Sequence, residues 1–197
     1  GPDPVAENKC LRNLGIKEVP LLILSHFHAD HVGGLSGLLQ SRRVGQVWIS
    51  NNLEPLLEST HALMLLRESE VVTVQKGLVS EIAGIQFEIL WPENTSKNFE
   101  SMPGDGSQIN NSSIAMLVTT ADWSMFTAGD LEPPAQHEIL GSVRTVDIYK
   151  VCHHGSKYQD QELMEALSPQ IAVISVGAKN SYGHPAPETI ASLTRLG

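Results

Sequence analysis

Apolar runs alternate with stretches of helical periodicity along most of the chain. The pattern predicts strands at 19–24, 47–49, 71–74, 146–151 and 171–176. It predicts helices at 32–41, 53–67 (with Asn52 as the cap), 133–140, 161–167 and from Pro187 onward. Two hairpins are expected, 79–82 with 85–90 and 114–119 with 123–127, and a long polar loop spans 91–111. Strands that alternate with helices favour a layered α/β architecture.

Polar clusters occur where the predicted strands begin or end. They are His26, Asn110-Asn111, Gly129-Asp130, His153-His154 and His184. Strand ends in such a fold can converge on one edge of the sheets, so these residues are expected to share a site.

The composition describes one globular domain without an obvious nucleic-acid surface. With 197 residues, 41% hydrophobic and 18% charged, we expect a single domain over 1–197. No apolar run approaches the roughly 20 residues of a membrane helix. The net charge is −9, from 22 acidic and 13 basic residues, the reverse of a usual nucleic-acid binder. A polyanionic substrate would therefore depend on bound metal for local attraction. Cys10 and Cys152 are expected to be buried structural thiols.

The strongest chemical signal is the segment Ser25-His26-Phe27-His28-Ala29-Asp30-His31, directly after an apolar strand. Alternate residues of a strand-to-helix turn can point to one side, so His26 and His28 can bind one ion. Asp30 and His31 then stand at the helix start and can face a second ion. Imidazole and carboxylate groups suit zinc, manganese or iron. A surface turn rich in histidine is the alternative, and it does not explain why four ligand-type residues follow a strand.

Three later segments supply further candidates. Asp130 follows a strand and a glycine, where its carboxylate can bridge two cations, although Gly-Asp alone is a common turn signal. His153 and His154 follow another strand, and neighbours in an extended chain point opposite ways, so one of the two is expected to be a ligand. His184 is flanked by Gly183 and Pro185 in a turn. A lone histidine in a loop is more often simply solvated.

These motifs resemble those of a known superfamily. His26-Phe27-His28-Ala29-Asp30-His31 matches the HxHxDH signature of the metallo-β-lactamase superfamily. The later segments resemble, in this order, the C-terminal domain of ComEC-type competence proteins, the DNA-uptake channels of transformable bacteria. Those segments are Asn110-Asn111-Ser112-Ser113, Thr127-Ala128-Gly129-Asp130, Lys150-Val151-Cys152-His153-His154-Gly155-Ser156 and Asn180-Ser181-Tyr182-Gly183-His184-Pro185. A pattern with His-His-Gly-Ser also occurs in the choline-binding phosphorylcholine esterases.

The resemblance implies an αββα sandwich, here trimmed of outer strands at both ends, with a dinuclear site. By resemblance, His26 and His28 hold the first ion, Asp30 and His31 the second, Asp130 bridges, and His154 (or His153) completes the second site. Many members have a histidine as the third ligand of the first ion, where this chain offers Asn110 and Asn111. An amide oxygen is a harder and weaker ligand than imidazole, which predicts looser occupancy and a shift from zinc toward manganese.

The expected chemistry is phosphodiester hydrolysis. Two cations about 3.5–4 Å apart lower the pKa of a bridging water, and the hydroxide attacks phosphorus. Asp30 is expected to orient the hydroxide, and His153 or His184 to contact the phosphate or protonate the leaving oxygen. Substrate-binding candidates are Asn111, Ser156 and Asn180.

The family setting predicts a nuclease that degrades the non-imported DNA strand during transformation. The domain would belong to a polytopic membrane channel, outside the cytoplasm, without inserting into the membrane itself. Two alternatives stay open: a phosphodiesterase for small or cell-wall esters of the phosphorylcholine type, and a non-catalytic, metal-stabilised module of a DNA channel.

Overall fold

The computed structural model describes residues 1–93, 97–103, 107–177 and 180–196. The chain divides into two compact units, Gly1–Val74 and Gln75–Gly197. Each unit has its own sheet and its own apolar core. The predicted α/β fold class, with two sheets and helices, is therefore confirmed, and the single domain over 1–197 stays a prediction.

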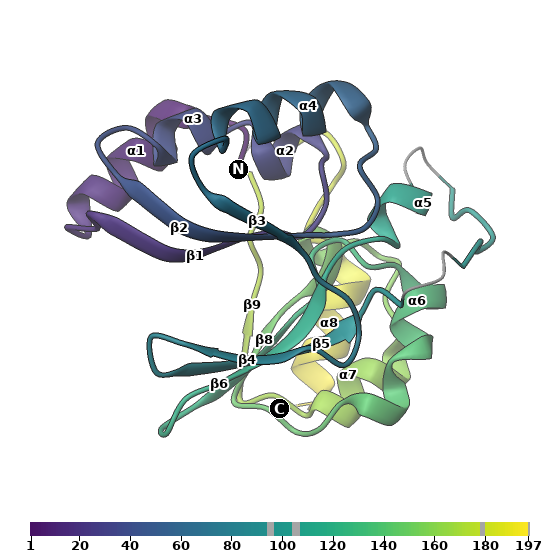
Figure 1. Cartoon of the computed structure of the whole chain (residues 1–197). Coiled ribbons are helices and arrows are strands. Elements are labelled where there is room, and N and C mark those ends of the chain that lie inside the picture. The colour runs from purple at the N-terminus through teal and green to yellow at the C-terminus, as the bar shows by residue number, and fades with distance from the viewer. Residues whose placement is uncertain (94–96, 104–106, 178–179, 197) are drawn as a thin grey trace. The chain divides into compact units, whose positions relative to one another are not determined.

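The first unit is a three-stranded parallel sheet with four short helices on one face (Figure 1). Its strands are β1 (Glu18–Leu24), β2 (Arg43–Ile49) and β3 (Glu70–Thr73), in the order β1-β2-β3. Its helices are α1 (Pro4–Asn13), α2 (Ala29–Val32), α3 (Leu35–Leu38) and α4 (Leu56–Leu65). Pro20 lies on the edge strand β1 and is skipped in the register with β2, as expected for a residue without an N–H.

Helix α1 was not expected from the hydrophobic pattern, although its start carries clear signals. The Asp3 side chain accepts hydrogen bonds from the backbone N–H groups of Val5 and Ala6, and Pro4 occupies the first helical position. The helix packs closely on α3, where a Cβ at Gly37 would collide with the backbone of Pro4. We infer that glycine is needed at position 37 for this close approach of two backbones.

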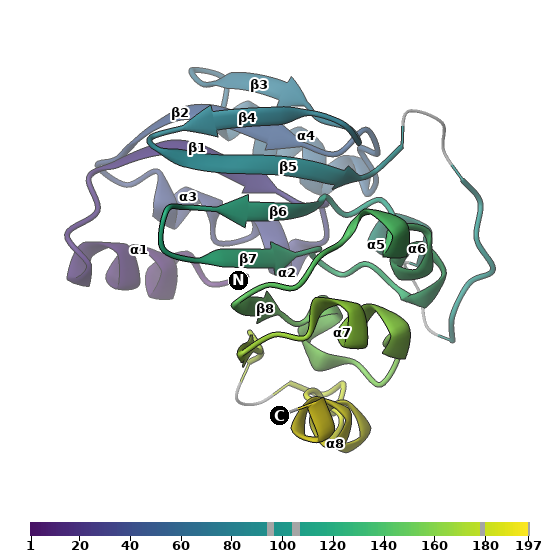
Figure 2. The ribbon, with the colours of Figure 1, turned by 90° about the horizontal axis from the view of Figure 1, so that it is seen from below.

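The second unit is a six-stranded mixed sheet in the order β4-β5-β6-β7-β8-β9. Figure 2 shows its strands β4 to β8 in this order. The strands β4 (Val79–Ile82), β5 (Ile85–Trp91), β6 (Ala115–Thr119) and β7 (Ser124–Thr127) are antiparallel neighbours. The strands β8 (Ile148–Lys150) and β9 (Ile171–Val173) continue the sheet in parallel with β7. Its helices are α5 (Ser107–Asn110), α6 (Pro133–Glu138), α7 (Gln161–Leu167) and α8 (Pro187–Leu196), with 3₁₀ turns at Leu140–Ser142 and Cys152–Gly155.

Side chains from the second sheet and from α6 and α7 form one core around Phe126, Tyr149 and Leu163, which are fully buried. Both predicted hairpins are present in this sheet. The predicted loop 91–111 contains α5, and its residues 94–96 and 104–106 lie outside the described part of the chain. None of the described helices is both long and apolar enough to cross a bilayer.

Three local expectations were wrong. The predicted helix 32–41 is two short helices, α2 and α3, separated at Gly33-Gly34. Asn52 does not cap α4, because the helix begins at Leu56 after Pro55, and the Asn52 side chain accepts from the backbone N–H of Glu54 instead. Cys10 is exposed on α1, whereas Cys152 is buried as expected.

Candidate metal ligands in the two units

The first group of candidate ligands lies at the carboxyl end of β1. Phe27 is fully buried in the core of the first unit and anchors the segment that follows the strand. On either side of it, Nε2 of His26 and Nδ1 of His28 are 3.1 Å apart. Two nitrogens that each bind a tetrahedral zinc at about 2.0–2.1 Å are themselves about 3.3 Å apart. The spacing of this pair therefore suits two ligands of one ion.

Asp30 and His31 extend this group from the first turn of α2. The ring centroids of His26 and His31 are 4.0 Å apart. Nε2 of His31 lies 3.6 Å from Oδ2 of Asp30, whose side chain is 49% exposed. The four predicted residues of the HxHxDH motif are thus neighbours within the first unit.

Glycines 33 and 34 follow this motif, but not because they need unusual backbone angles. Both have ordinary helical values of φ. A Cβ at Gly34 would lie 2.6 Å from the carbonyl oxygen of Gly1, and the N–H of Gly34 donates to that oxygen at 2.8 Å. The glycine leaves room for the first residues of the chain to pack against α2.

The second group lies at the carboxyl ends of β7 and β8. Because these strands are parallel neighbours, the segments that follow them emerge at the same edge of the sheet. The backbone N–H of His153 donates to the carbonyl of Gly129 at 3.0 Å and joins the two segments. The N–H of Asp130 donates to Oγ of Ser113 at 3.1 Å, and Asp130 is buried.

His153 and His154 do not lie in an extended chain, so the premise that they point opposite ways was wrong. Both have left-handed backbone angles, with φ of 45° and 54°, which non-glycine residues adopt at a cost of about 1–3 kcal/mol. As a result both imidazoles approach the same carboxylate. Nε2 of His154 lies 3.3 Å from Oδ2 of Asp130, and Nε2 of His153 lies 3.9 Å from it.

The two histidines differ at their other ring nitrogens. Nδ1 of His154 donates to the carbonyl oxygen of Ser175 at 2.7 Å. Since a carbonyl can only accept, the neutral His154 ring carries its lone pair on Nε2, toward Asp130. This is the usual arrangement of a metal-binding histidine. Nδ1 of His153 instead lies 3.7 Å from Oε1 of Glu132. The geometry favours His154 as the ligand.

Glu132 was missed by the sequence analysis. It is 3% exposed and interacts with both asparagines that were expected near the metal. Asn110 donates its side-chain amide to Oε1 of Glu132, and Asn111 accepts from the N–H of Glu132, each at 3.0 Å. The signal available in the sequence was an acidic residue two positions after Asp130, but acidic side chains are usually exposed.

The His184 turn is held by the side chain of Asn180. The Asn180 amide donates to the carbonyls of Gly177 and His184, and its oxygen accepts from the N–H of His184. Burial lowers the pKa of His184, and the nearby His153 and His154 lower it further. The His184 ring centroid lies 5.7 Å from that of His153, which places both predicted histidines in the same region of the second unit.

The residues that were predicted to contact the substrate form hydrogen bonds with other parts of the protein. Asn111 and Ser156 are buried, and Oγ of Ser156 accepts from the N–H of Tyr158 at 3.2 Å. Together with Asn180, these residues shape the loops of the second unit. Their contact with a substrate stays a prediction.

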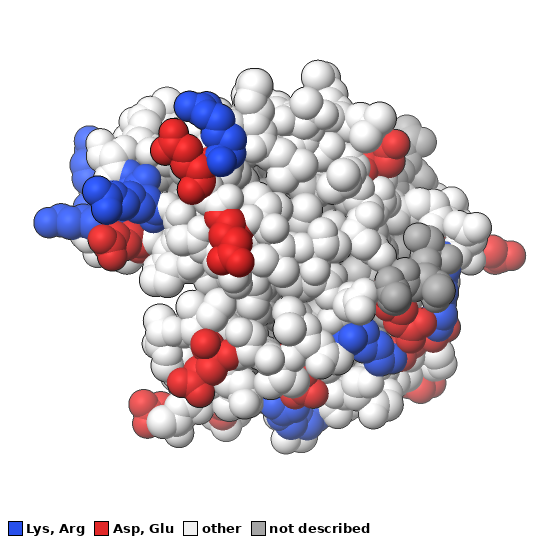
Figure 3. Space-filling view, viewed as in Figure 1, with Lys and Arg blue, Asp and Glu red and all other residues white. Residues whose placement is uncertain are grey.

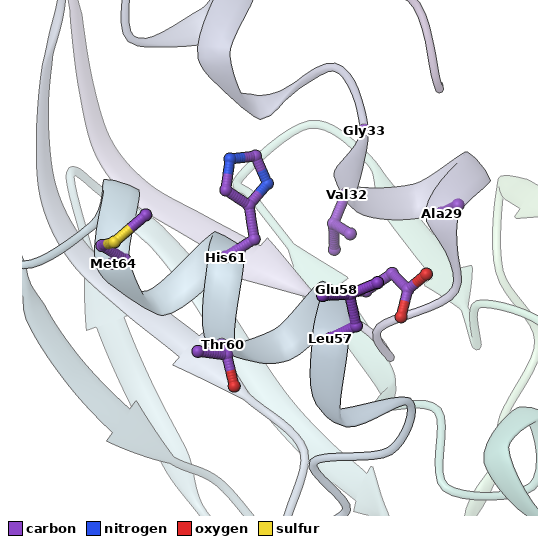
Figure 4. Close-up of a pocket in the computed structure, with 8 residues that line it drawn as sticks. All are labelled: Ala29, Val32, Gly33, Leu57, Glu58, Thr60, His61 and Met64. Atoms are coloured by element: carbon purple, nitrogen blue, oxygen red, sulfur yellow. The ribbon is translucent and has the colours of Figure 1, made fainter.

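An open hollow of about 530 Å³ lies between α2 and α4 in the first unit (Figure 4). Glu58 and His61 of α4 supply its ionisable groups. The remaining lining residues are Ala29, Val32, Gly33, Leu57, Thr60 and Met64. The hollow borders the helix that carries Asp30 and His31, and no sequence pattern indicated it.

Both groups of residues fit divalent metal ions. The donors are imidazole nitrogens and carboxylate oxygens, which borderline and hard cations accept. Their mutual distances of 3.1–3.6 Å within each group are those of ligands that share an ion. Buried polar groups are normally hydrogen-bonded, yet Nδ1 of His153 and Oε2 of Glu132 are buried without a hydrogen-bond partner in the described residues.

Comparison with known proteins decides the family. A sequence model of the Metallo-beta-lactamase superfamily matches residues 2–106, more than half of the chain. The chain belongs to this superfamily. That region contains the complete His26–His31 motif, so the predicted family is confirmed on the residues that suggested it.

The resemblance to competence proteins is also confirmed. ComE operon protein 3 of Bacillus subtilis is 32% identical over 186 residues, which cover 92% of this chain and 23% of that protein. Competence protein ComA of Neisseria gonorrhoeae is 24% identical over 179 residues, covering 89% of this chain and 22% of that protein. Recombination protein 2 of Haemophilus influenzae is 28% identical over 165 residues, which cover 83% of this chain and 18% of that protein. The chain thus spans less than a quarter of the length of these relatives.

Among solved structures, CmlA, a diiron β-hydroxylase from Streptomyces venezuelae, shares the fold. It aligns with a TM-score of 0.59 and 15% identity, over 91% of this chain and 42% of that protein. At this identity the likeness shows the fold alone.

Proposed function

We propose that this chain is a metal-dependent phosphodiesterase that cleaves DNA, and that it degrades the non-imported strand during DNA uptake. One observation carries the proposal: the second unit holds Asp130 and a correctly oriented His154, in a chain that also carries the HxHxDH cluster. The names of the relatives, which include a competence protein and a recombination protein, support DNA as the substrate.

We propose that both groups of ligands serve one dinuclear centre. In this assignment His26 and His28 would hold the first ion, Asp30, His31 and His154 would hold the second, and Asp130 would contribute its carboxylate to both. Family membership and the ligand types support the assignment. Asn110 and Asn111 stand where many members have the third histidine. The Asn111 oxygen already accepts from the N–H of Glu132, whereas Oδ1 of Asn110 is buried without a hydrogen-bond partner in the described residues, and this harder oxygen donor favours manganese over zinc.

The residues around this centre have separate tasks. Two divalent cations, when bound, supply a nucleophilic hydroxide near neutral pH and stabilise charge on the phosphoryl oxygens. The half-exposed Asp30 carboxylate accepts a hydrogen bond from the attacking water and orients it. His153 or His184 contacts the phosphate or protonates the leaving 3′ or 5′ oxygen. Asn180 keeps His184 in place for this contact.

Charge distribution bears on how DNA approaches. The net charge of −9 opposes binding, but basic side chains gather over α1 and the adjoining strand ends in the first unit (Figure 3). They include the exposed Lys9, Arg12, Lys17 and Arg43. We propose that this surface contributes to attraction of the DNA backbone. We also propose that this domain is joined to a membrane channel and lies on the extracytoplasmic face; the greater length of the competence-protein relatives is compatible with such a further part.

The proposal is tested with single- and double-stranded DNA in buffers that contain Mn²⁺, Mg²⁺ or Zn²⁺. Wild type is expected to cut DNA, best with Mn²⁺, and His28→Ala and Asp130→Ala are expected to lose at least 100-fold in rate. Circular dichroism of each variant checks that the fold persists. Equal rates in wild type and both folded variants would disprove the assignment.

A chromogenic phosphodiester and a phosphorylcholine ester are assayed beside DNA. Turnover of these esters without DNA cleavage would identify a small-ester phosphodiesterase. Metal binding without turnover of any substrate would identify a non-catalytic, metal-stabilised module. Either result would replace the nuclease proposal.

A further inference from the structure

Glu132 is a buried carboxylate whose position is not explained by stability alone. Its side chain is 4% exposed, and an ionised carboxylate in such a place is costly unless it is paired. Within the described residues, the ion-pair contact that the structure gives it is with His153. No lysine or arginine in that part of the chain neutralises it. Its partner is therefore a residue of the proposed site.

The carboxylate is held in place from two sides. The side chain of Asn110 donates to Oε1, while Asn111 accepts from the backbone N–H of Glu132, which precedes α6. Asn110 and Asn111 are themselves buried. Oε2 of Glu132 has no hydrogen-bond partner among the described residues, so the carboxylate retains capacity to accept another donor.

The His153 ring lies between two carboxylates, with one of them near each ring nitrogen. Nδ1 lies 3.7 Å from Oε1 of Glu132, and Nε2 lies 3.9 Å from Oδ2 of Asp130. The left-handed backbone angles at His153 and the hydrogen bond from its N–H to the carbonyl of Gly129 fix the direction in which the side chain leaves the backbone. A movement of about 0.8 Å brings Nδ1 to hydrogen-bond distance of Glu132.

We propose that Glu132 is a positioning residue for His153. The carboxylate accepts from Nδ1–H of His153, which fixes the ring's tautomer and keeps Nε2 on the side of Asp130 and the substrate phosphate, where it donates to an oxygen only after it has itself taken up a proton. Asn110 restrains the carboxylate so that only one ring orientation is favoured. The same logic orients histidines in other sites, where a carboxylate behind the ring sets which nitrogen faces the chemistry. The kinetic part of this inference rests on the proposed phosphodiesterase activity.

A purely structural role for Glu132 predicts different behaviour. In that role the residue only joins Asn110 and Asn111 to the start of α6. Glu132→Gln preserves these bonds, because the amide oxygen still accepts from Asn110 and the backbone N–H is unchanged. It removes the negative charge, so the same Oε1 atom becomes a weaker acceptor for Nδ1–H of His153. Glu132→Leu removes the acceptor entirely, and Glu138→Gln on the exposed side of α6 is the matched control.

The experiment reads the His153 ring directly. Long-range ¹H–¹⁵N correlation spectra of the metal-free and zinc-loaded chain report which nitrogen carries the proton, with the signal assigned through His153→Gln. The Nδ1–H form is expected in wild type and in Glu138→Gln, and a mixture or the Nε2–H form in Glu132→Leu. An unchanged His153 tautomer in Glu132→Leu would overturn the proposal. If Glu132→Leu does not fold, Glu132→Gln provides the same comparison with a smaller expected shift.

Kinetics and metal content complete the test. For Glu132→Gln we expect kcat on DNA to fall at least tenfold, with KM and bound metal per chain within twofold of wild type. Glu132→Asp is expected to restore part of the loss. Unchanged kcat in Glu132→Gln would overturn the positioning role. Absence of DNA cleavage in every protein, wild type included, would disprove the proposed function, while the tautomer measurement would still decide the role of Glu132.

Discussion

Nε2 of His154 lies 3.3 Å from Oδ2 of Asp130, and the other nitrogen of the same ring donates to the carbonyl of Ser175. The backbone carbonyl thus determines which nitrogen is available as a ligand. His153, one residue earlier, has its Nδ1 directed at Glu132 instead. Two adjacent histidines with the same unusual backbone conformation therefore have different partners, and we expect them to have different roles.

A first prediction concerns metal content. Asp130→Asn in the second unit and His31→Ala in the first are each expected to lower bound metal by at least half, because each removes a donor of the proposed shared centre. Elemental analysis after dialysis against Mn²⁺ or Zn²⁺ provides the measurement. His137→Gln, at an exposed histidine on α6, is the control and is expected to retain full metal content. Loss in only one of the two variants would show that the two groups do not share ions.

A second prediction concerns the packing of α1. Gly37→Ala is expected to destabilise the fold by about 1–3 kcal/mol, because the added methyl group has no space beside Pro4. Gly141→Ala is the matched control, since a Cβ at Gly141 meets no atom within 4 Å. Urea unfolding curves of both variants measure the difference. Equal free energies of unfolding for the two variants would show that α1 can shift to accommodate the methyl group without destabilising the fold.

A third prediction concerns the two thiols. Burial raises the pKa of Cys152 to about 11, so very little thiolate is present at pH 8. Cys10 is exposed on α1. We expect one equivalent of iodoacetamide to react at Cys10 in the native protein and a second only after denaturation, as read by mass spectrometry. Rapid labelling of Cys152 in the folded chain would contradict its burial.

A fourth prediction concerns stability in acid. The hydroxyl and the backbone N–H of Ser124 both donate to Asp147 and lower the pKa of its carboxyl from the usual 3.8. A lowered pKa in the folded state stabilises the fold above the unfolded-state value, and this stabilisation disappears as pH falls through the folded-state value.

Asp147→Asn should therefore unfold at lower urea than wild type at pH 7, and the gap should narrow below pH 3.8. Asp122→Asn, in an exposed turn, serves as the control and is expected to show no such gap. A gap for Asp147→Asn that is constant with pH would show that the loss has another cause.

The parts of the fold that the sequence predicted are those determined by local pattern. The His26–His31 motif is contiguous, so its four ligand-type residues are neighbours in any fold that turns after β1. The two hairpins likewise follow from alternation and short turns. Glu132 could not be predicted as a site residue from the sequence, because what marks it is its burial in contact with Asn110, Asn111 and His153, which are distant from it in the chain.

The helix α1 and the His153-His154 turn were missed for different reasons. The capping signals of Asp3 and Pro4 were present, but the apolar periodicity of α1 is weak and none of its residues is buried. The left-handed angles at His153 and His154 cannot be expected from the residues themselves, since histidine has no preference for them comparable to glycine's. They depend on tertiary contacts such as the bond from His153 to Gly129.

The left-handed turn at His153 and His154 lowers the stability of the fold but positions the two imidazoles of the proposed site. Glycine at either position would relieve about 1 kcal/mol or more of backbone strain, yet it would delete an imidazole. A laboratory selection for thermal stability alone would therefore favour variants that have lost one of these imidazoles. Libraries built to make the chain more stable should therefore hold both positions fixed, because the strain and the two imidazoles come together.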